Sequence, residues 1–232
     1  MRLRERNKLR RMPLFADIEA DHIEALLLNS KLQRFPSHVE VMREGATADF
    51  LHVVVDGQAE VFSTYRDRET TVAVLGPGDS FFIAALILDK ICLESVRTLS
   101  PARVLLVPAE AVRQLFYADA TFAQAIALEL ACAYRGIMKE LKNQKLRSTI
   151  ERLANFLLTQ NEQSGAKGRF TLPFEKKVLA SRLGMAPEVL SRSFLALLPR
   201  KVRVCGAEVE IHDVEALRDL AKPSSTIDNS AV

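Results

Sequence analysis

The amino-acid sequence predicts an α+β protein built from a β-barrel or jelly roll, a long helix and a C-terminal winged helix-turn-helix. Short runs of alternating apolar and polar residues fill positions 31–108 and predict the barrel. Apolar residues at helical spacing over 109–144 predict the long helix, and two short helical patterns before a hairpin pattern at 172–211 predict the winged part. The expected boundaries are 1–108 for the barrel with an N-terminal helix, 109–145 for the long helix, 146–221 for the winged part and 222–232 for a disordered tail.

Composition narrows the class of protein and its surroundings. The chain has 232 residues, of which 48% are hydrophobic and 26% charged, values typical of a globular protein, and no apolar run is long enough to cross a bilayer. The net charge of +3 means that any surface for a polyanion must be local. Cys92, Cys132 and Cys205 lie far apart, and the basic N-terminus lacks the apolar core of a secretory signal. We therefore expect a cytoplasmic protein without an iron–sulfur cluster or a structural zinc on its own cysteines.

Turn residues separate the predicted strands of the barrel. Pairs such as Asp56-Gly57 and Ser100-Pro101 fall between the alternating runs, and many short strands at this spacing indicate a sandwich, jelly roll or barrel. A helical pattern at 14–28 precedes the strands and is expected to cap the barrel. The basic residues before that helix predict a frayed, solvated end.

The long helix carries a stripe of apolar residues whose spacing alternates between three and four residues. The steps are four, four, three, four and four, which is typical of a seam between two helices. The alternative is that the helix packs only on its own barrel. The length of the stripe favours a seam with a second copy of the chain. The predicted dimer interface is Phe122, Ile126, Leu130, Ala133, Ile137 and Leu141.

The predicted reading head is the pair of short helices in 172–211. Gly184 supplies a turn between the helices, and Pro187 suits the first turn of the second helix. A hairpin of two short alternating runs follows as a wing. Pro199 ends the second helix sharply, so the sequence does not determine the angle of the wing. The helical period directs five residues of the second helix toward a core, and these are Val189, Leu190, Phe194, Leu197 and Leu198.

Glu188, Ser191 and Arg192 point away from that core and carry chemistry suited to DNA bases. Arginine can bind guanine O6 and N7 together, a carboxylate accepts from cytosine N4, and a serine hydroxyl serves several bases. The alternative is a surface ion pair between Glu188 and Arg192, four residues apart, but the turn before them and the wing after them favour DNA. The residues expected at phosphates are Arg169, Lys176, Lys177, Arg200, Lys201 and Arg203.

The order of barrel, long helix and winged head resembles the CRP/FNR superfamily of bacterial transcription regulators over about residues 14–221. The stretches that carry the resemblance are FLHVVVDGQAEVF, GPGDSFF and LASRLGMAPEVLSRSF. Glu188, Ser191 and Arg192 match the E-x-x-S-R pattern of the FNR-like branch, which reads TTGAT-type half-sites. The resemblance implies a homodimer on a palindrome close to TTGAT-N4-ATCAA, with double-stranded DNA and RNA polymerase as partners and no membrane.

The expected effector pocket departs from the cyclic-AMP-binding members of that family. Their F-x-G-E-L segment holds the ribose with a glutamate, and here Ala85 stands at that position. Cys92 and Leu93 stand where those members have the arginine and hydroxyl that bind the cyclic phosphate. A buried phosphate without a cationic partner is costly, which argues against cyclic AMP. The predicted pocket is Phe82, Ala84, Ala85, Leu86, Cys92 and Leu93.

The sequence also lacks the residues that serve two other sensing modes of the family. The N-terminus lacks the cysteine cluster of oxygen-sensing members, and Phe82 and Ala84 replace the cysteine and histidine with which carbon-monoxide sensors bind haem. The barrel and head are most similar to the denitrification branch, which favours a haem or nitric-oxide signal. His22, His38 and His52 are the candidate haem ligands, although a lone histidine is more often packed or on the surface.

Two alternatives to a ligand-controlled DNA-binding regulator remain open. One is a signalling module whose barrel binds a small molecule while its head does not bind DNA. The other is a regulator controlled by oxidation of Cys92 or Cys205 instead of by a ligand. We do not expect an enzyme, because the sequence shows no Ser/His/Asp set, Gly-rich phosphate loop or metal-spaced histidine and carboxylate cluster.

Overall fold

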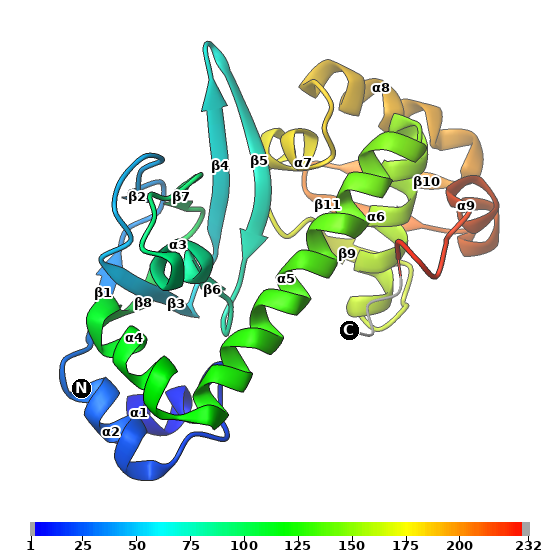
Figure 1. The fold of residues 1–232 in the computed structure, drawn as a ribbon. Coiled ribbons are helices and arrows are strands. Elements are labelled where there is room, and N and C mark those ends of the chain that lie inside the picture. The colour runs from blue at the N-terminus through cyan, green and yellow to red at the C-terminus, as the bar shows by residue number, and fades with distance from the viewer. Residues whose placement is uncertain (1–2, 229–232) are drawn as a thin grey trace. The chain divides into compact units, whose positions relative to one another are not determined.

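Figure 1 shows the computed structural model of the chain, which describes residues 3–228. The chain divides into two compact units, and the division falls within one long helix, between Ala133 and Tyr134. The first unit contains the barrel and the helices around it, and the second contains the winged helix-turn-helix.

Two antiparallel four-stranded sheets form the barrel, as the alternating runs predict. A short helix that the sequence reading missed, α3 (Ile83–Leu88), follows the last strand of one sheet. The first sheet has the order β1 (Lys31–Phe35), β8 (Ala102–Pro108), β3 (Phe50–Asp56) and β6 (Ser80–Phe81). The second has the order β2 (Glu40–Met42), β7 (Ser95–Thr98), β4 (Ala59–Tyr65) and β5 (Arg68–Leu75).

Strand β3 is apolar from Phe50 to Val55 except for His52, because both of its faces are covered. Leu51 and Val53 pack in one hydrophobic cluster and Val54 in another. The turn after β3 depends on Gly57, whose φ is +82° and whose added Cβ would lie 2.4 Å from the carbonyl oxygen of Pro101. The turn therefore accepts only a residue without a side chain.

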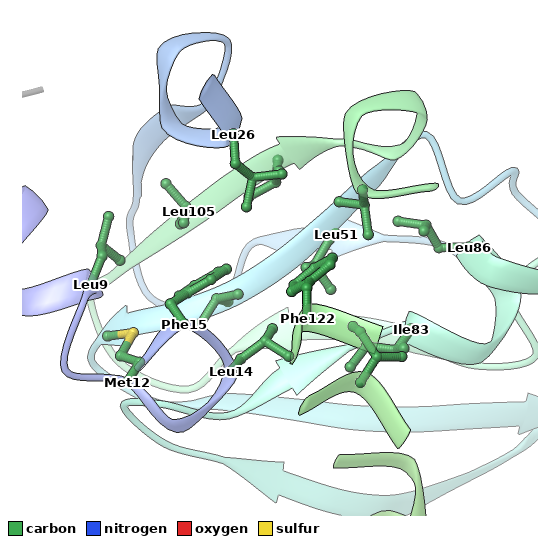
Figure 2. Close-up of a cluster of buried hydrophobic side chains, with 14 of the residues drawn as sticks. Leu9, Met12, Leu14, Phe15, Leu26, Leu51, Ile83, Leu86, Leu105 and Phe122 are labelled. Carbon is green, nitrogen blue, oxygen red and sulfur yellow. The ribbon is translucent and has the colours of Figure 1, made fainter. Parts of the chain in front are cut away.

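The N-terminal segment is folded against the barrel, so the prediction of a frayed end is wrong for its described residues. Helix α1 (Leu3–Leu9), the 3-10 turn η1 (Pro13–Phe15) and α2 (Ala20–Leu28) contribute Leu9, Phe15 and Leu26 to the core in Figure 2. The basic side chains of Arg6 and Arg10 both pair with Glu24. Burial of apolar side chains and these ion pairs together hold the segment in place.

The predicted long helix is two helices, α4 (Ala109–Ala118) and α5 (Ala120–Leu146). Asp119 lies between them in an extended conformation, and its Oδ1 accepts hydrogen bonds from the N–H groups of Thr121 (2.8 Å) and Phe122 (3.0 Å). Among the described residues no single helix is long and apolar enough to cross a bilayer. Only α4 and α5 taken together pass a test of length and composition, and they are bent by 113°.

Phe122 and Ile126 cannot take part in the dimer interface predicted for them. Both are fully buried in the hydrophobic core of their own barrel, where Phe122 lies close to Leu51 in Figure 2. A helix face that packs on its own barrel and a helix face that packs on a partner helix show the same spacing of apolar residues. The sequence pattern therefore could not tell the core residues from the interface residues.

The second unit confirms the predicted winged helix-turn-helix and adds a third strand to the wing. Strand β9 pairs with β11, which pairs with β10. Ser148 and Glu151 form a capping box at the start of α6. The elements are α6 (Thr149–Gln163), β9 (Arg169–Thr171), α7 (Lys176–Arg182), α8 (Pro187–Ala196), the 3-10 turn η2 (Leu198–Arg200), β10 (Val202–Cys205), β11 (Glu208–Ile211) and α9 (Val214–Ala221).

Residues 222–228 are not the disordered tail that the sequence predicts. The carboxylate of Asp228 pairs with Arg147, and the Thr226 hydroxyl accepts a hydrogen bond of 2.7 Å from Lys142 Nζ. Arg147 is largely buried by these contacts. The rest of the predicted tail, residues 229–232, lies outside the described residues.

Candidate nucleic-acid interface

The turn between α7 and α8 is fixed by Arg152, a buried residue of α6. Its Nε donates a hydrogen bond of 2.7 Å to the carbonyl of Leu183, and a terminal nitrogen reaches the carbonyl of Gly184 at 3.3 Å. Gly184 adopts a φ of +61° and ends α7, as its place in the sequence predicts. These bonds satisfy carbonyls at the C-terminal end of α7 and thereby set the direction in which α8 leaves the turn.

The same turn also contacts the C-terminal part of α5. Gln144 Nε2 donates to the carbonyl of Arg182 at 3.3 Å and to Glu140 at 2.7 Å. An added Cβ on Gly184 would lie 2.2 Å from Gln144 Oε1. The helix predicted to form the dimer therefore touches the helix-turn-helix directly, and a side chain at position 184 would displace the Gln144 amide.

Helix α8 presents Glu188, Ser191 and Arg192 on its exposed face, while Leu190 and Ser193 face the core. Arg192 Nε donates to the backbone carbonyl of Glu188 at 3.4 Å, and among the described residues no ion pair joins the two side chains. Among the described residues, Glu188 and Arg192 therefore do not form the surface ion pair that was the alternative to DNA contacts. The Ser191 hydroxyl donates to the carbonyl of Pro187 at 3.0 Å, which leaves its oxygen able to accept.

All six residues expected at phosphates are exposed, but their charges differ in availability. Arg169 pairs with Glu210, and Lys201 Nζ lies 3.2 Å from the carboxylate of Asp213. The hydrogen bond from Arg169 holds the pKa of the Glu210 carboxyl below its usual range. Within residues 3–228 no ion pair engages the other four. The exposed residues are Arg169, Lys176, Lys177, Arg200, Lys201 and Arg203.

Pro199 lies inside η2, so the recognition helix ends at Ala196 and a single 3-10 turn leads to the wing. Lys201 then adopts a left-handed conformation with φ of +59° and reverses the chain into β10. Leu198, which the helical period directs to the core, is exposed because it lies beyond the end of α8. The wing itself turns at Gly206, and Cys205 beside it is exposed.

The six residues predicted to form an effector pocket do not line one cavity. Leu86 and Cys92 are buried, whereas Ala84 and Leu93 are exposed, because the segment after β6 folds into α3. Cys92 and Leu93 alone belong to a surface cavity of about 560 Å³, whose wall also includes Arg43 and Phe62. Burial raises the pKa of the Cys92 thiol, which makes it a poor nucleophile.

A charge network on the barrel was missed by the sequence reading. Arg97 on β7 donates to the buried carboxylate of Glu60 at 2.7 Å and to both oxygens of Glu69, while its guanidinium lies 4.3 Å from the centre of the Phe62 ring. The only signal for it in the sequence is the presence of Glu60, Glu69 and Arg97 within these strands, and their pairing also depends on the strand register. Both carboxylates hold the cation, so Arg97 is not available to a phosphate.

The candidate haem ligands have three different environments. His52 is buried among the rings of Phe50, Phe81 and Phe82, with its centroid 4.7 Å from that of Phe81, and burial lowers its pKa to about 4. Its Nδ1 has no hydrogen-bond partner. His22 Nδ1 lies 2.5 Å from the carboxylate of Asp119, and His38 is exposed at a turn.

The surroundings of His52 do not fit a haem site. Phenylalanine rings surround His52, and neither the 560 Å³ cavity nor a second one of about 300 Å³ beside α5 is lined by a histidine. Within residues 3–228 no group of three or more histidine, cysteine or carboxylate side chains could hold a metal ion. Ligation by His52 would require the aromatic cluster to open.

Comparison with known proteins covers both units. A model described as a cyclic nucleotide-binding domain matches residues 32–119, and one described as a Crp-like helix-turn-helix domain matches residues 151–220. No curated protein matches the chain significantly. Among solved structures, one from Silicibacter pomeroyi, provisionally described as a cAMP-binding regulatory protein, is 27% identical, with a TM-score of 0.60 over 94% of this chain and 99% of that one.

Two further solved structures have the same fold at lower identity. One from Eubacterium rectale, provisionally described as a transcriptional regulator of the CRP/FNR family, is 20% identical, with a TM-score of 0.74 over 91% of this chain and 98% of that one. FixK2 from Bradyrhizobium japonicum is 20% identical, with a TM-score of 0.73 over 84% of this chain and 98% of that one.

Proposed function

Because the chain belongs to the CRP/FNR superfamily of transcription regulators, we propose that it acts as a homodimer reading a palindrome close to TTGAT-N4-ATCAA. The observation that carries this proposal is the exposed face of α8, on which Glu188, Ser191 and Arg192 lie together without an ion pair between them. A recognition helix uses this part of its surface to contact base edges. Its partners are then double-stranded DNA and RNA polymerase, in the cytoplasm.

The proposed dimer uses a face of α5 that differs from the predicted stripe. Leu130, Ile137 and Leu141 stay in the seam, and Ala127 and Tyr134 join them at steps of three, four, three and four. Ile137 and Tyr134 are largely exposed in the single chain, and such large apolar side chains in one row favour a partner helix. Phe122 and Ile126 lie in the core, and Ala133 lies at the edge of this face.

We propose further that the barrel responds to a signal other than cyclic AMP. The relative from Silicibacter pomeroyi is described as binding that nucleotide. In this chain Cys92 is a buried thiol and Leu93 is exposed. Arg43, which lines the same cavity, pairs with Glu40, and Arg97 is held by Glu60 and Glu69. Cyclic AMP is expected to leave the melting temperature and the DNA affinity unchanged, and a clear rise in either would contradict this part of the proposal.

Fluorescence anisotropy with a TTGAT-N4-ATCAA duplex and a scrambled duplex tests the DNA-binding function. We expect preferential binding of the palindrome, with an affinity that falls steeply as salt concentration rises. A barrel module with a head that does not bind DNA would show no preference at any salt concentration. Salt-dependent binding of both duplexes with equal affinity would reject only the TTGAT assignment.

The same titration after haem loading and exposure to nitric oxide tests the sensing hypothesis. Specific binding only in that state would make the barrel a gas sensor and would mean that the cluster around His52 opens. Equal binding with and without haem would remove haem from the control of this protein. Loss of binding on mild oxidation, absent in Cys205→Ser, would instead identify the wing thiol as the control point.

A further inference from the structure

The exposed face of α8 continues beyond Arg192 to a leucine that has no part in the core. Leu195 follows Glu188, Ser191 and Arg192 at seven, four and three residues, spacings that place all four on one side of a helix. Its side chain is 65% exposed. Leu190 and Leu197, on the opposite side, are buried in the core of the unit.

Single exposed leucines are common on protein surfaces, so the exposure of Leu195 does not by itself indicate a binding role. Its position on the helix does. Leu195 lies near the C-terminal end of α8, one turn after Ser191 and Arg192 on the face that the proposed function assigns to the major groove. The side chain gains free energy there only if DNA covers it with an apolar group. In the major groove the apolar group of the bases is the C5 methyl of thymine.

We propose that Leu195 packs against the C5 methyl of a thymine and thereby specifies a T·A pair beside the guanine read by Arg192. The inference rests on the proposed function and names one more specificity residue of the same surface. Three residues of helix span about 4.5 Å, and successive base pairs are about 3.4 Å apart. The thymine therefore lies within two base pairs of that guanine, on either strand.

A uracil scan tests the contact because deoxyuridine differs from thymidine at this position only by the methyl group. Each thymine within two base pairs of the guanine is replaced in one half-site, and the affinity is measured by anisotropy. At one position the wild-type protein is expected to bind about fourfold more weakly, which corresponds to about 0.8 kcal/mol for one methyl group removed from water. Leu195→Ala should bind the thymine and uracil duplexes with equal affinity.

Leu198→Ala is the matched control. Leu198 is also an exposed leucine, but it lies beyond the end of α8, in η2. This variant should keep the uracil sensitivity of the wild type, as should Leu195→Met, which keeps an apolar side chain of similar volume. Circular dichroism checks that each variant is folded.

Two results would overturn the assignment of Leu195. Wild-type protein that binds every uracil duplex as tightly as the parent duplex would show that no thymine methyl near the guanine is read. An equal loss in Leu195→Ala and wild type would show that another group reads the methyl. Absence of specific binding by the wild type is a separate outcome, because it rejects the proposed function before Leu195 is tested.

Discussion

At the scale of single residues, the guanidinium of Arg192 is the group most able to distinguish one base pair. It is exposed, and it contacts the carbonyl of Glu188 and not the carboxylate. We expect Arg192→Ala to weaken binding to the palindrome by about 1–3 kcal/mol and to relax the preference at the guanine position. Anisotropy with duplexes that carry each of the four base pairs at this position measures both effects.

Arg203→Ala is the matched control for this prediction. Arg203 lies on β10 opposite Glu210, and its side chain is exposed on the outer face of the wing. Its loss should weaken binding to all duplexes by a similar factor and lower the slope of log affinity against log salt by about one for each wing. A base-specific effect of Arg203→Ala, or a uniform effect of Arg192→Ala, would reverse the roles given to the two arginines.

His22 and Asp119 provide a pH-dependent contribution to the stability of the first unit. The hydrogen bond to Asp119 raises the pKa of His22 above its usual value of 6.5. A raised pKa means that the contribution is fully present below pH 6.5 and is lost as pH rises through the folded pKa. The free energy of unfolding of the wild type should therefore fall with rising pH above 6.5, more steeply than that of His22→Gln.

Urea unfolding at several pH values measures this difference. Backbone hydrogen bonds, first from Phe122, lower the pKa of Asp119, so the contribution of Asp119 is lost only in strong acid and does not overlap with that of His22. Identical slopes for wild type and His22→Gln above pH 6.5 would contradict the assignment.

At the scale of elements, the exposed face of α5 leads to a prediction about assembly. Ile137 and Leu128 are each 62% exposed, but only Ile137 lies in the proposed seam. Ile137→Glu would bury a carboxylate from each copy, at a cost of roughly several kcal/mol for each ion, and should convert the dimer to a monomer. Leu128→Glu should leave the dimer intact, and analytical ultracentrifugation distinguishes the two variants. Dissociation by both would place the interface elsewhere on the helix.

The elements differ in how far the sequence could predict them. The strands, the helix-turn-helix and the wing follow from periods of two and 3.6 residues and were predicted. The break at Asp119 was not, because apolar residues keep a helical spacing on both sides of it. Strand β9 has only three residues, too few to show an alternation, and α1 was hidden by its basic composition.

The candidate site also contains residues that the sequence could place and residues that it could not. Glu188, Ser191 and Arg192 were predicted to face outward because the turn of a helix determines which residues share a side. The pocket residues were placed by resemblance to chains with another sequence after the G-D turn. Here Ala84 lies in α3 and is exposed, whereas Cys92 follows that helix and is buried. The Arg97 network depends on strand register, which the sequence pattern alone does not give.

At the scale of the whole molecule, the apolar residues gather in cores that belong to different units. Leu51 is fully buried in the barrel and Leu157 in the helix-turn-helix unit, and the described cluster of the second unit shares no residue with those of the barrel. Leu157→Ala should lower the free energy of unfolding of the second unit by about 2–5 kcal/mol and leave the barrel unchanged. Leu51→Ala should do the reverse, and hydrogen exchange followed by mass spectrometry reports each unit separately. Equal loss of protection in both units would mean that they unfold together.

The contact between Gly184 and Gln144 has an evolutionary consequence. A side chain at position 184 would be strained by the φ of +61° and would displace the Gln144 amide from its present place. In related chains the two positions should therefore change together, with an alanine or asparagine at 184 accompanied by a shorter residue at 144. Lineages that broke this pairing would lose the hydrogen bond from Gln144 to the Arg182 carbonyl, which is one contact between α5 and the reading head.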